Sequence, residues 1–194
     1  MEIKKEIFRE YDIRGIYGEE LNEETAYYIG LAYGTKLKTF GKDSCVLAHD
    51  NRASSPKLCE FMIKGLVESG IKVLNLGLAT TPTCYFAANY YKVDASMMIT
   101  ASHNPKEYNG FKFSYNGIHN AYGDSVREIY DIIESKNFSK GMGSVENVDI
   151  TVPYIDLILK GIKLGDRKIK VVYDCGNGTT SIIADKIFDG LDVI

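Results

Sequence analysis

Short apolar runs alternate with longer amphipathic segments along most of the chain. The runs have the length of buried strands and lie at 44–49, 71–76, 94–99 and 168–174. The amphipathic segments, which we expect to form helices, lie at 22–40, 56–69, 83–91, 121–136, 153–162 and 179–188. Strand, loop and helix recur about every 25 residues, the pattern of right-handed βαβ units. This predicts an α/β fold with a mainly parallel sheet and helices on both faces.

Two further segments carry the alternation of a half-buried strand. Residues 7–18 alternate before two glycines and suit an edge strand or hairpin. Residues 109–115 place their aromatic rings on one face and Lys112 on the other, and form the strand that returns after 94–99. The sheet is therefore expected to be mixed within a three-layer α/β/α domain. Lys112 is either solvated, as most lysines on such strands are, or turned toward a site.

Domain boundaries follow from a stretch of small residues. Residues 139–144 form the best linker candidate, since four of the six are glycine or serine. We expect a first domain at 1–145 and, at 146–194, a linker with the incomplete beginning of a second, similar domain. Residues 176–178 are expected to form a tight strand-to-helix turn, and 191–194 to begin another strand.

Three loops follow predicted strands, at 50–55, 78–82 and 100–105. In a parallel sheet the carboxyl ends of strands share one edge, where ligands bind, so these loops are expected to lie together. Arg52 lies beside a predicted helix start, where free N–H groups and a guanidinium favour an anion. Ser55 is placed to cap that helix, with Pro56 as its first residue.

Ser102 follows the apolar run at 94–99 and precedes Asn104-Pro105. A proline fixes its own φ and restricts the residue before it, so the backbone beyond Ser102 has few ways to turn. The Ser102 hydroxyl either forms a hydrogen bond within this turn or is held by the turn in a fixed orientation toward a site. Arg14, beside Gly15, is likewise either a surface arginine paired with a carboxylate such as Asp12 or part of a site.

Composition narrows the class of protein. The 194 residues are 45% hydrophobic, enough for a sizeable core, and the net charge of −3 lacks the basic footprint of a nucleic-acid-binding protein. No apolar run approaches the length needed to cross a bilayer, and no secretory signal is apparent, so a cytoplasmic protein without membrane contact is expected. Its four cysteines lack a paired spacing and are expected to be reduced and buried.

Five segments, taken together, resemble the signatures of the α-D-phosphohexomutases, the phosphomannomutase/phosphoglucomutase family. They are Phe8 to Gly15 (FREYDIRG), Asp50 to Ser55 (DNRASS), Thr100 to Pro105 (TASHNP), Asn109 to Lys112 (NGFK) and Asp174 to Gly178 (DCGNG). They occur in the family's order and extend over the whole chain. The resemblance implies an enzyme that interconverts hexose 1-phosphate and hexose 6-phosphate through a phosphoserine and a hexose 1,6-bisphosphate.

The resemblance also implies roles for individual residues. Ser102 would carry the transferred phosphoryl group, Lys112 would move a proton, and Arg14 would stabilise charge, since arginine is a poor proton acceptor. The residues expected to bind phosphate or support the loop are His103, Arg52, Asn104 and Thr100. Because consecutive side chains of an extended segment diverge, we do not expect Ser102 and His103 to form a hydrolase dyad.

The family's Mg²⁺ is held by the phosphoserine and an aspartate-rich loop, and its sugar-binding loops lie in third and fourth domains. Of these ligands the chain offers only the phosphate of Ser102, and the remaining elements are not found in the sequence. We therefore expect a fragment that is inactive by itself. A phosphoglucosamine mutase is an alternative, as is a non-catalytic module that binds a sugar phosphate. The preferred hexose and the oligomeric state stay open.

Overall fold

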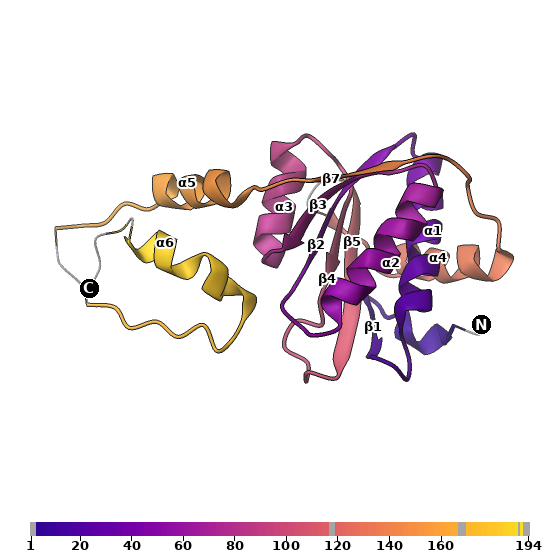
Figure 1. The fold of residues 1–194 in the computed structure, drawn as a ribbon, viewed down its shortest axis with the longest axis horizontal. Helices are drawn as coiled ribbons and strands as arrows, with labels where there is room; N and C mark the ends of the chain where they lie inside the picture. Colours follow the sequence, from indigo (N-terminus) through magenta and orange to yellow (C-terminus); the bar gives the residue numbers. More distant parts are fainter. Residues whose placement is uncertain (1–2, 117–118, 167–169, 190, 192–194) are drawn as a thin grey trace.

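The computed structural model describes residues 3–116, 119–166, 170–189 and 191 (Figure 1). The strands are β1 (Ile13–Ile16), β2 (Ser44–His49), β3 (Lys72–Leu78), β4 (Ser96–Ile99), β5 (Tyr108–Asn116), β6 (His119–Asn120) and β7 (Ser144–Asn147). The helices are α1 (Glu23–Thr39), α2 (Ser55–Glu68), α3 (Thr81–Tyr90), α4 (Asp124–Ser135), α5 (Thr151–Gly161) and α6 (Ala184–Asp189). Short 3₁₀ turns, η1 (Lys5–Ile7) and η2 (Thr179–Ile182), complete the described elements.

The described strands form one seven-stranded sheet in the order β1-β5-β4-β2-β3-β7, with β6 paired to β5. The neighbours β4, β2, β3 and β7 pair in parallel, whereas β5 runs antiparallel to β1, β4 and β6. The mixed, mainly parallel sheet predicted from the sequence is therefore confirmed. β1 lies at the edge, as the pattern of residues 7–18 predicts.

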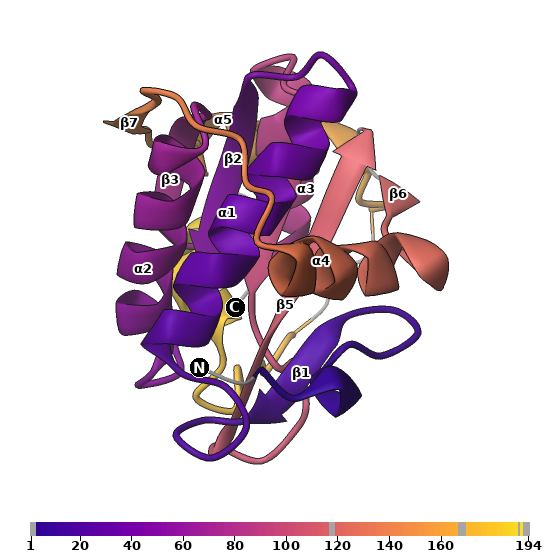
Figure 2. The ribbon, with the colours of Figure 1, turned by 90° about the vertical axis from the view of Figure 1, so that its right-hand side faces the viewer.

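Side chains alternate between the two faces of the sheet and build two cores. Cys45 and Leu47 of β2 point into the larger core, which α1, α2 and α4 cover, while Val46 and Ala48 point into a smaller core under α3. Figure 2 shows α1, α2 and α4 together on the near face. Both faces of the central strands are buried under helices, which explains the nearly continuous apolar sequence of these strands. This is the expected three-layer arrangement.

Two glycines set the distance between α1 and α2. A Cβ at Gly30 would lie 2.6 Å from the Met62 carbonyl oxygen, and one at Gly65 would lie 2.2 Å from that of Tyr27. The backbones touch at this crossing, so larger residues would force the helices apart. The helix expected at 22–40 is α1, and Asn22 caps it by accepting a hydrogen bond of 3.0 Å from the Thr25 amide.

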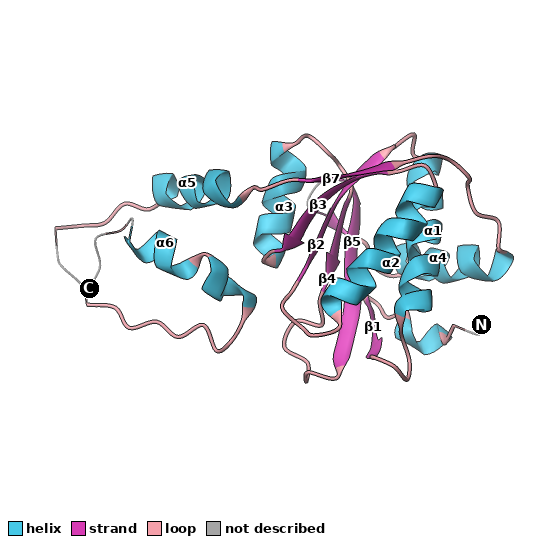
Figure 3. Cartoon of the chain, viewed as in Figure 1, coloured by secondary structure: helices cyan, strands magenta, loops and turns pink. Residues whose placement is uncertain are grey.

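The carboxyl-terminal part is organised differently from the sheet. Residues 139–144, the predicted linker, run past α2 and lead into β7, which pairs with β3 and so belongs to the sheet of the first domain. The domain boundary at 145 stays a prediction, although β7 extends across it. Beyond β7 the structure has α5, η2 and α6 joined by loops (Figure 3).

The strand predicted at 168–174 is absent from the part of that range that the structure describes, residues 170–174. A strand needs a hydrogen-bonded neighbour, and no described strand pairs with this segment. The tight turn at 176–178 is present, with a hydrogen bond of 2.8 Å from the Gly178 amide to the Cys175 carbonyl. The helix predicted at 179–188 is divided into η2 and α6, and the strand predicted at 191–194 lies largely outside the described residues. No helix among the described residues is long and apolar enough for a membrane span.

Candidate functional site

Ser102 lies at the carboxyl end of β4 with its side chain exposed. Its φ of 55° is in the left-handed region, which a residue with a Cβ adopts only when its surroundings fix it. Two local hydrogen bonds do so: the Ser102 amide donates to Thr100 Oγ1 at 2.9 Å, and the Asn104 amide donates to the Ala101 carbonyl at 3.0 Å. The backbone thus presents the hydroxyl at the edge of the sheet.

Arg52 holds this loop from the neighbouring strand end. Its guanidinium donates to four backbone carbonyl oxygens, those of Ser102 (2.9 Å), Asn104 (2.7 Å), Pro105 (2.6 Å) and Tyr108 (3.0 Å). The remaining donor, Nε, bonds to Asp50 Oδ2 at 3.2 Å. All five donors of an arginine are then committed within the protein, so none is left for an anion. Of the two roles expected of Arg52, phosphate binding or support of the loop, these contacts favour support of the loop.

The Asp50 carboxylate is the buried anchor of this arrangement. Besides Arg52 Nε, it accepts hydrogen bonds from the Arg52 amide (3.1 Å) and from Ser55 Oγ (2.6 Å). The prediction that Ser55 caps α2 is therefore wrong: α2 begins at Ser55, and its hydroxyl bonds to the carboxylate, a stronger acceptor. Asn109, fully buried, donates to Ser55 Oγ at 2.9 Å. Asp50 and Asn109 belong to two of the segments that resemble the family's signatures. No pattern in the sequence predicted that both are buried and hydrogen-bonded to the Ser55 hydroxyl.

Arg14, Asp12 and Lys112 form a charged cluster on adjacent strands. Arg14 pairs with Gly110 in the β1–β5 register, so Lys112, two residues further along β5, lies on the same face. Arg14 Nη2 bonds to the Asp12 carboxylate, and Lys112 Nζ lies 3.6 Å from Asp12 Oδ2. Two cations share one carboxylate, so the cluster keeps a net positive charge. The sequence suggested Asp12 only as an ion-pair partner of Arg14 at the surface. The Arg14 side chain is instead only 10% exposed.

The cluster contacts the Ser102 loop at one point. Arg14 Nη1 donates to Asn104 Oδ1 at 2.5 Å, two residues beyond Ser102. The Arg14 Nε atom is buried and has no hydrogen-bond partner. Lys112 contacts this group through Asp12, and its side chain is 25% exposed. Arg14 and Lys112 are therefore near the loop, although neither lines the cavity that Ser102 enters.

His103 departs from the prediction that its side chain diverges from that of Ser102. Its Nδ1 lies 3.3 Å from Ser102 Oγ. The prediction assumed an extended backbone, and the left-handed φ of Ser102 instead turns the two neighbouring side chains to the same side. The imidazole is thus in contact with the hydroxyl that the sequence singles out.

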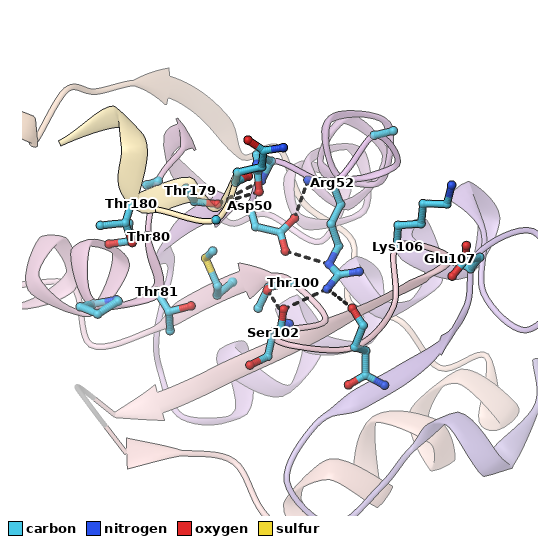
Figure 4. A pocket seen from close by; sticks show the side chains of 18 residues that line it. Asp50, Arg52, Thr80, Thr81, Thr100, Ser102, Lys106, Glu107, Thr179 and Thr180 are labelled. Carbon is cyan, nitrogen blue, oxygen red and sulfur yellow. Dashed lines mark hydrogen bonds and ion pairs between the residues drawn. The ribbon is translucent and has the colours of Figure 1, made fainter. Parts of the chain in front are cut away.

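A cavity of about 820 Å³ opens beside Ser102 (Figure 4). Its lining includes the three predicted loops, which the sheet brings to one edge as expected; these contribute Asp50 to Ala53, Ala79 to Pro82, and Thr100, Ser102 and Asn104. The far wall comes from the carboxyl-terminal segment, through Gly176, Asn177, Thr179 and Thr180. These four residues were not foreseen, because no local signal in the sequence shows which surface a distant turn contacts.

The described residues do not fit a magnesium site by themselves. No group of three or more His, Cys, Asp or Glu residues in the described part of the chain lies close enough together to hold a metal ion. The Asp12 and Asp50 carboxylates are each paired with an arginine. Binding of Mg²⁺ through the phosphate of Ser102 therefore stays a prediction.

The fold and the loop that presents Ser102 define an α/β/α domain of a known class. The family described as phosphoglucomutase/phosphomannomutase, α/β/α domain I, matches residues 5–140, and the chain belongs to this family.

The chain is similar to curated members of this family over most of its own length. It is 40% identical over 185 residues to a phosphomannomutase/phosphoglucomutase of Pseudomonas aeruginosa, covering 95% of this chain and 40% of the relative. It is 42% identical over 191 residues to a phosphoglucomutase of Neisseria gonorrhoeae, covering 97% and 41%.

A crystal structure of a phosphoglucomutase/phosphomannomutase family protein from Burkholderia thailandensis superimposes with a TM-score of 0.93 at 37% identity, covering 99% of this chain and 43% of that one. The chain thus spans about two fifths of the length of these relatives.

Proposed function

We propose that this chain is the phosphoserine-bearing part of a phosphohexomutase of the phosphomannomutase/phosphoglucomutase type. The whole protein would interconvert hexose 1-phosphate and hexose 6-phosphate, with a hexose phosphate as its small-molecule partner. The observation that carries the proposal is the exposed Ser102 hydroxyl on a loop whose carbonyl groups Arg52 holds. Family membership and the similarity to curated mutases support the same interpretation.

The transfer step follows from the groups present. The bond between phosphorus and Ser102 Oγ breaks, a bond from phosphorus to a sugar hydroxyl oxygen forms, and the hydroxyl proton leaves to a base. In the second half, the bond between the other phosphorus of the resulting hexose 1,6-bisphosphate and its sugar oxygen breaks, and a bond from that phosphorus to Ser102 Oγ forms. The sugar oxygen takes back the proton from the base. Such transfer depends on positioning and charge stabilisation more than on covalent assistance.

The charged cluster suits this chemistry. A phosphoserine carries about −1.5 to −2 charges, and a second phosphate beside it requires cations. Arg14 reaches the Ser102 loop through Asn104, which places its positive charge beside that loop. Lys112 is the group assigned to proton transfer, and His103, 3.3 Å from Ser102 Oγ, is assigned to phosphate contact. In the whole protein, Mg²⁺ would neutralise phosphate charge, and no part of the argument from these residues depends on it.

Intact-mass measurement tests the proposal. The whole protein that contains this chain and its Ser102→Ala variant are incubated with glucose 1,6-bisphosphate and Mg²⁺. We expect the mass of the wild-type chain to increase by one phosphoryl group and that of the variant to stay unchanged. If Ser102 acquires no phosphate, either here or in the chain as isolated from cells, the proposal is contradicted in favour of a non-catalytic sugar-phosphate binding module.

A further inference from the structure

Asn51 joins two segments that lie more than 120 residues apart in the sequence. Its side-chain Nδ2 donates to the Asn177 carbonyl at 2.6 Å, and its amide donates to Thr179 Oγ1 at 3.2 Å. Thr179 Oγ1 in turn donates to Asn51 Oδ1 at 3.0 Å. Asn51 thus bonds with backbone and side chain to one turn of the carboxyl-terminal segment. These three hydrogen bonds are called the Asn51 contact below.

The turn at 176–179, to which Asn51 is hydrogen-bonded, is itself held by internal hydrogen bonds. The Gly176 amide donates to Asp174 Oδ1 at 2.7 Å, and the Gly178 amide donates to the Cys175 carbonyl at 2.8 Å. Asn177, at the tip, has a φ of 54° and directs its carbonyl toward Asn51. A turn held internally moves as a unit, so its displacement acts on Asn51 directly.

On its other side, Asn51 is continuous with the support of the Ser102 loop. It stands between Asp50 and Arg52 in the chain, and these two residues are bonded to each other through the side chain and the Arg52 amide. Arg52 then donates to the carbonyl groups of Ser102 and Asn104 (Figure 4). A short series of hydrogen bonds therefore runs from Thr179, through the loop at 50–52, to the residue that carries the hydroxyl.

We propose that Asn51 and Thr179 are positioning residues, which couple the placement of the turn at 176–179 to the presentation of the Ser102 hydroxyl. Both ends of the series line the same cavity, so a substrate there meets the turn and the hydroxyl together. The coupling is a property of the chain without phosphate, whereas its value for phosphoryl transfer rests on the proposed function.

Another amide contact provides a matched control. Asn75 Nδ2 donates to Asn147 Oδ1 at 2.8 Å, which joins β3 to β7 at a place that does not contact the Ser102 loop. Asn147→Ala therefore removes a side-chain hydrogen bond of the same kind between distant segments, and it leaves the Asn51 contact intact.

Hydrogen exchange of the 194-residue chain, followed by mass spectrometry, tests the coupling. Thr179→Val keeps the shape of the side chain and removes the hydroxyl, and Asn51→Ala removes the amide side chain. In both variants we expect amide exchange to rise at least about fivefold in peptides covering 176–180 and also in those covering 102–108, the factor that corresponds to one of the two hydrogen bonds that each substitution removes. Thr179→Ser, which keeps the hydroxyl, is expected to exchange like the wild type in both regions.

Two results overturn the proposal. One is faster exchange at 176–180 in Thr179→Val with unchanged exchange at 102–108, because the contact then holds the turn without affecting the Ser102 loop. The other is an equal rise at 102–108 in Asn147→Ala, which would indicate general loosening. Hydrogen exchange is measured without phosphate, so its result does not depend on whether Ser102 can be phosphorylated. The coupling and the proposed function can therefore fail independently of each other.

Discussion

Of the four non-glycine residues that the described part of the chain places in the left-handed region, two line the cavity, Ser102 with a φ of 55° and Asn177 with a φ of 54°. Their surroundings differ. The Ser102 turn follows β4, which is paired on both sides and has no exposed residue, and Arg52 holds it from the neighbouring loop. The Asn177 turn follows a segment without strand pairing among the described residues, most of it exposed.

The comparison shows what keeps a turn in a left-handed backbone conformation. Both turns have local hydrogen bonds and accept donors from a distant part of the sequence, but Arg52 donates to four carbonyl groups at 102–108, whereas Asn51 Nδ2 donates to one carbonyl group of the Asn177 turn. Such bonds keep a backbone in an unfavourable conformation, since the surrounding fold over-determines it. The Asn177 turn obtains its long-range partner from the same loop, through Asn51.

The reactivity of the four cysteines is expected to differ most strongly between the sheet domain and the carboxyl-terminal segment. Cys45 and Cys84 are fully buried in the sheet domain and Cys59 is nearly so, whereas Cys175 is half-buried beside the Asn177 turn. Burial raises the pKa of the Cys59 and Cys84 thiols to about 12, and that of Cys45 further. The thiolate is the reactive form, so at pH 8 these three thiols are both inaccessible and protonated.

We expect a thiol reagent such as Ellman's reagent at pH 8 to modify Cys175 at least about a thousandfold faster than the other three cysteines, which are labelled only through unfolding. Absorbance against time would show one fast equivalent in the native chain and four in urea. The Cys175→Ala variant should lose the fast phase. A second fast equivalent would mean that the sheet domain opens as readily as the terminal segment.

Arg52 is expected to give the next largest effect. Arg52→Met keeps the length of the side chain but leaves the Asp50 carboxylate buried without its cation and frees four carbonyl groups. Breaking one side of a buried ion pair costs about 3–5 kcal/mol, and we expect the free energy of unfolding in urea to fall by that amount.

The matched control is Arg127→Met, because the Arg127 side chain is 52% exposed and bonds to Glu10 and Asp124 at the surface. Its loss should cost at most about 1 kcal/mol. Equal effects at Arg52 and Arg127 would show that the guanidinium network does not hold the Ser102 loop.

The smallest expected effect concerns the left-handed backbone itself. Ser102→Gly and Ser102→Ala both remove the hydroxyl, but alanine retains the Cβ that disfavours a φ of 55°. We expect the glycine variant to be the more stable of the two by about 1 kcal/mol in urea unfolding. If alanine is as stable as glycine, the loop relaxes to another φ once the hydroxyl is absent, and the long-range bonds do not fix it.

Much of the fold was predictable because it depends on local patterns. Apolar runs of strand length, helix starts such as Asn22 and the aromatic alternation at 109–115 each report on their own segment. Combined with the direction of βαβ crossovers, they place three loops at one edge and Ser102 among them. The strand predicted at 168–174 is absent from 170–174, the described part of that range, because a strand depends on a neighbour that the local pattern does not reveal.

Only the tertiary structure decided how the residues of the site are used. The sequence marks Arg52 as a cation near a helix start, but the fold brings four carbonyl groups to it and leaves no donor for an anion. It marks Asp12 as a neighbour of Arg14, and the register of β1 on β5 makes that carboxylate shared with Lys112. Composition and periodicity therefore determined the sheet and the loop that carries Ser102. The partners of each charged group were determined by long-range packing, because hydrogen bonds join atoms that are close in space whatever their separation in the chain.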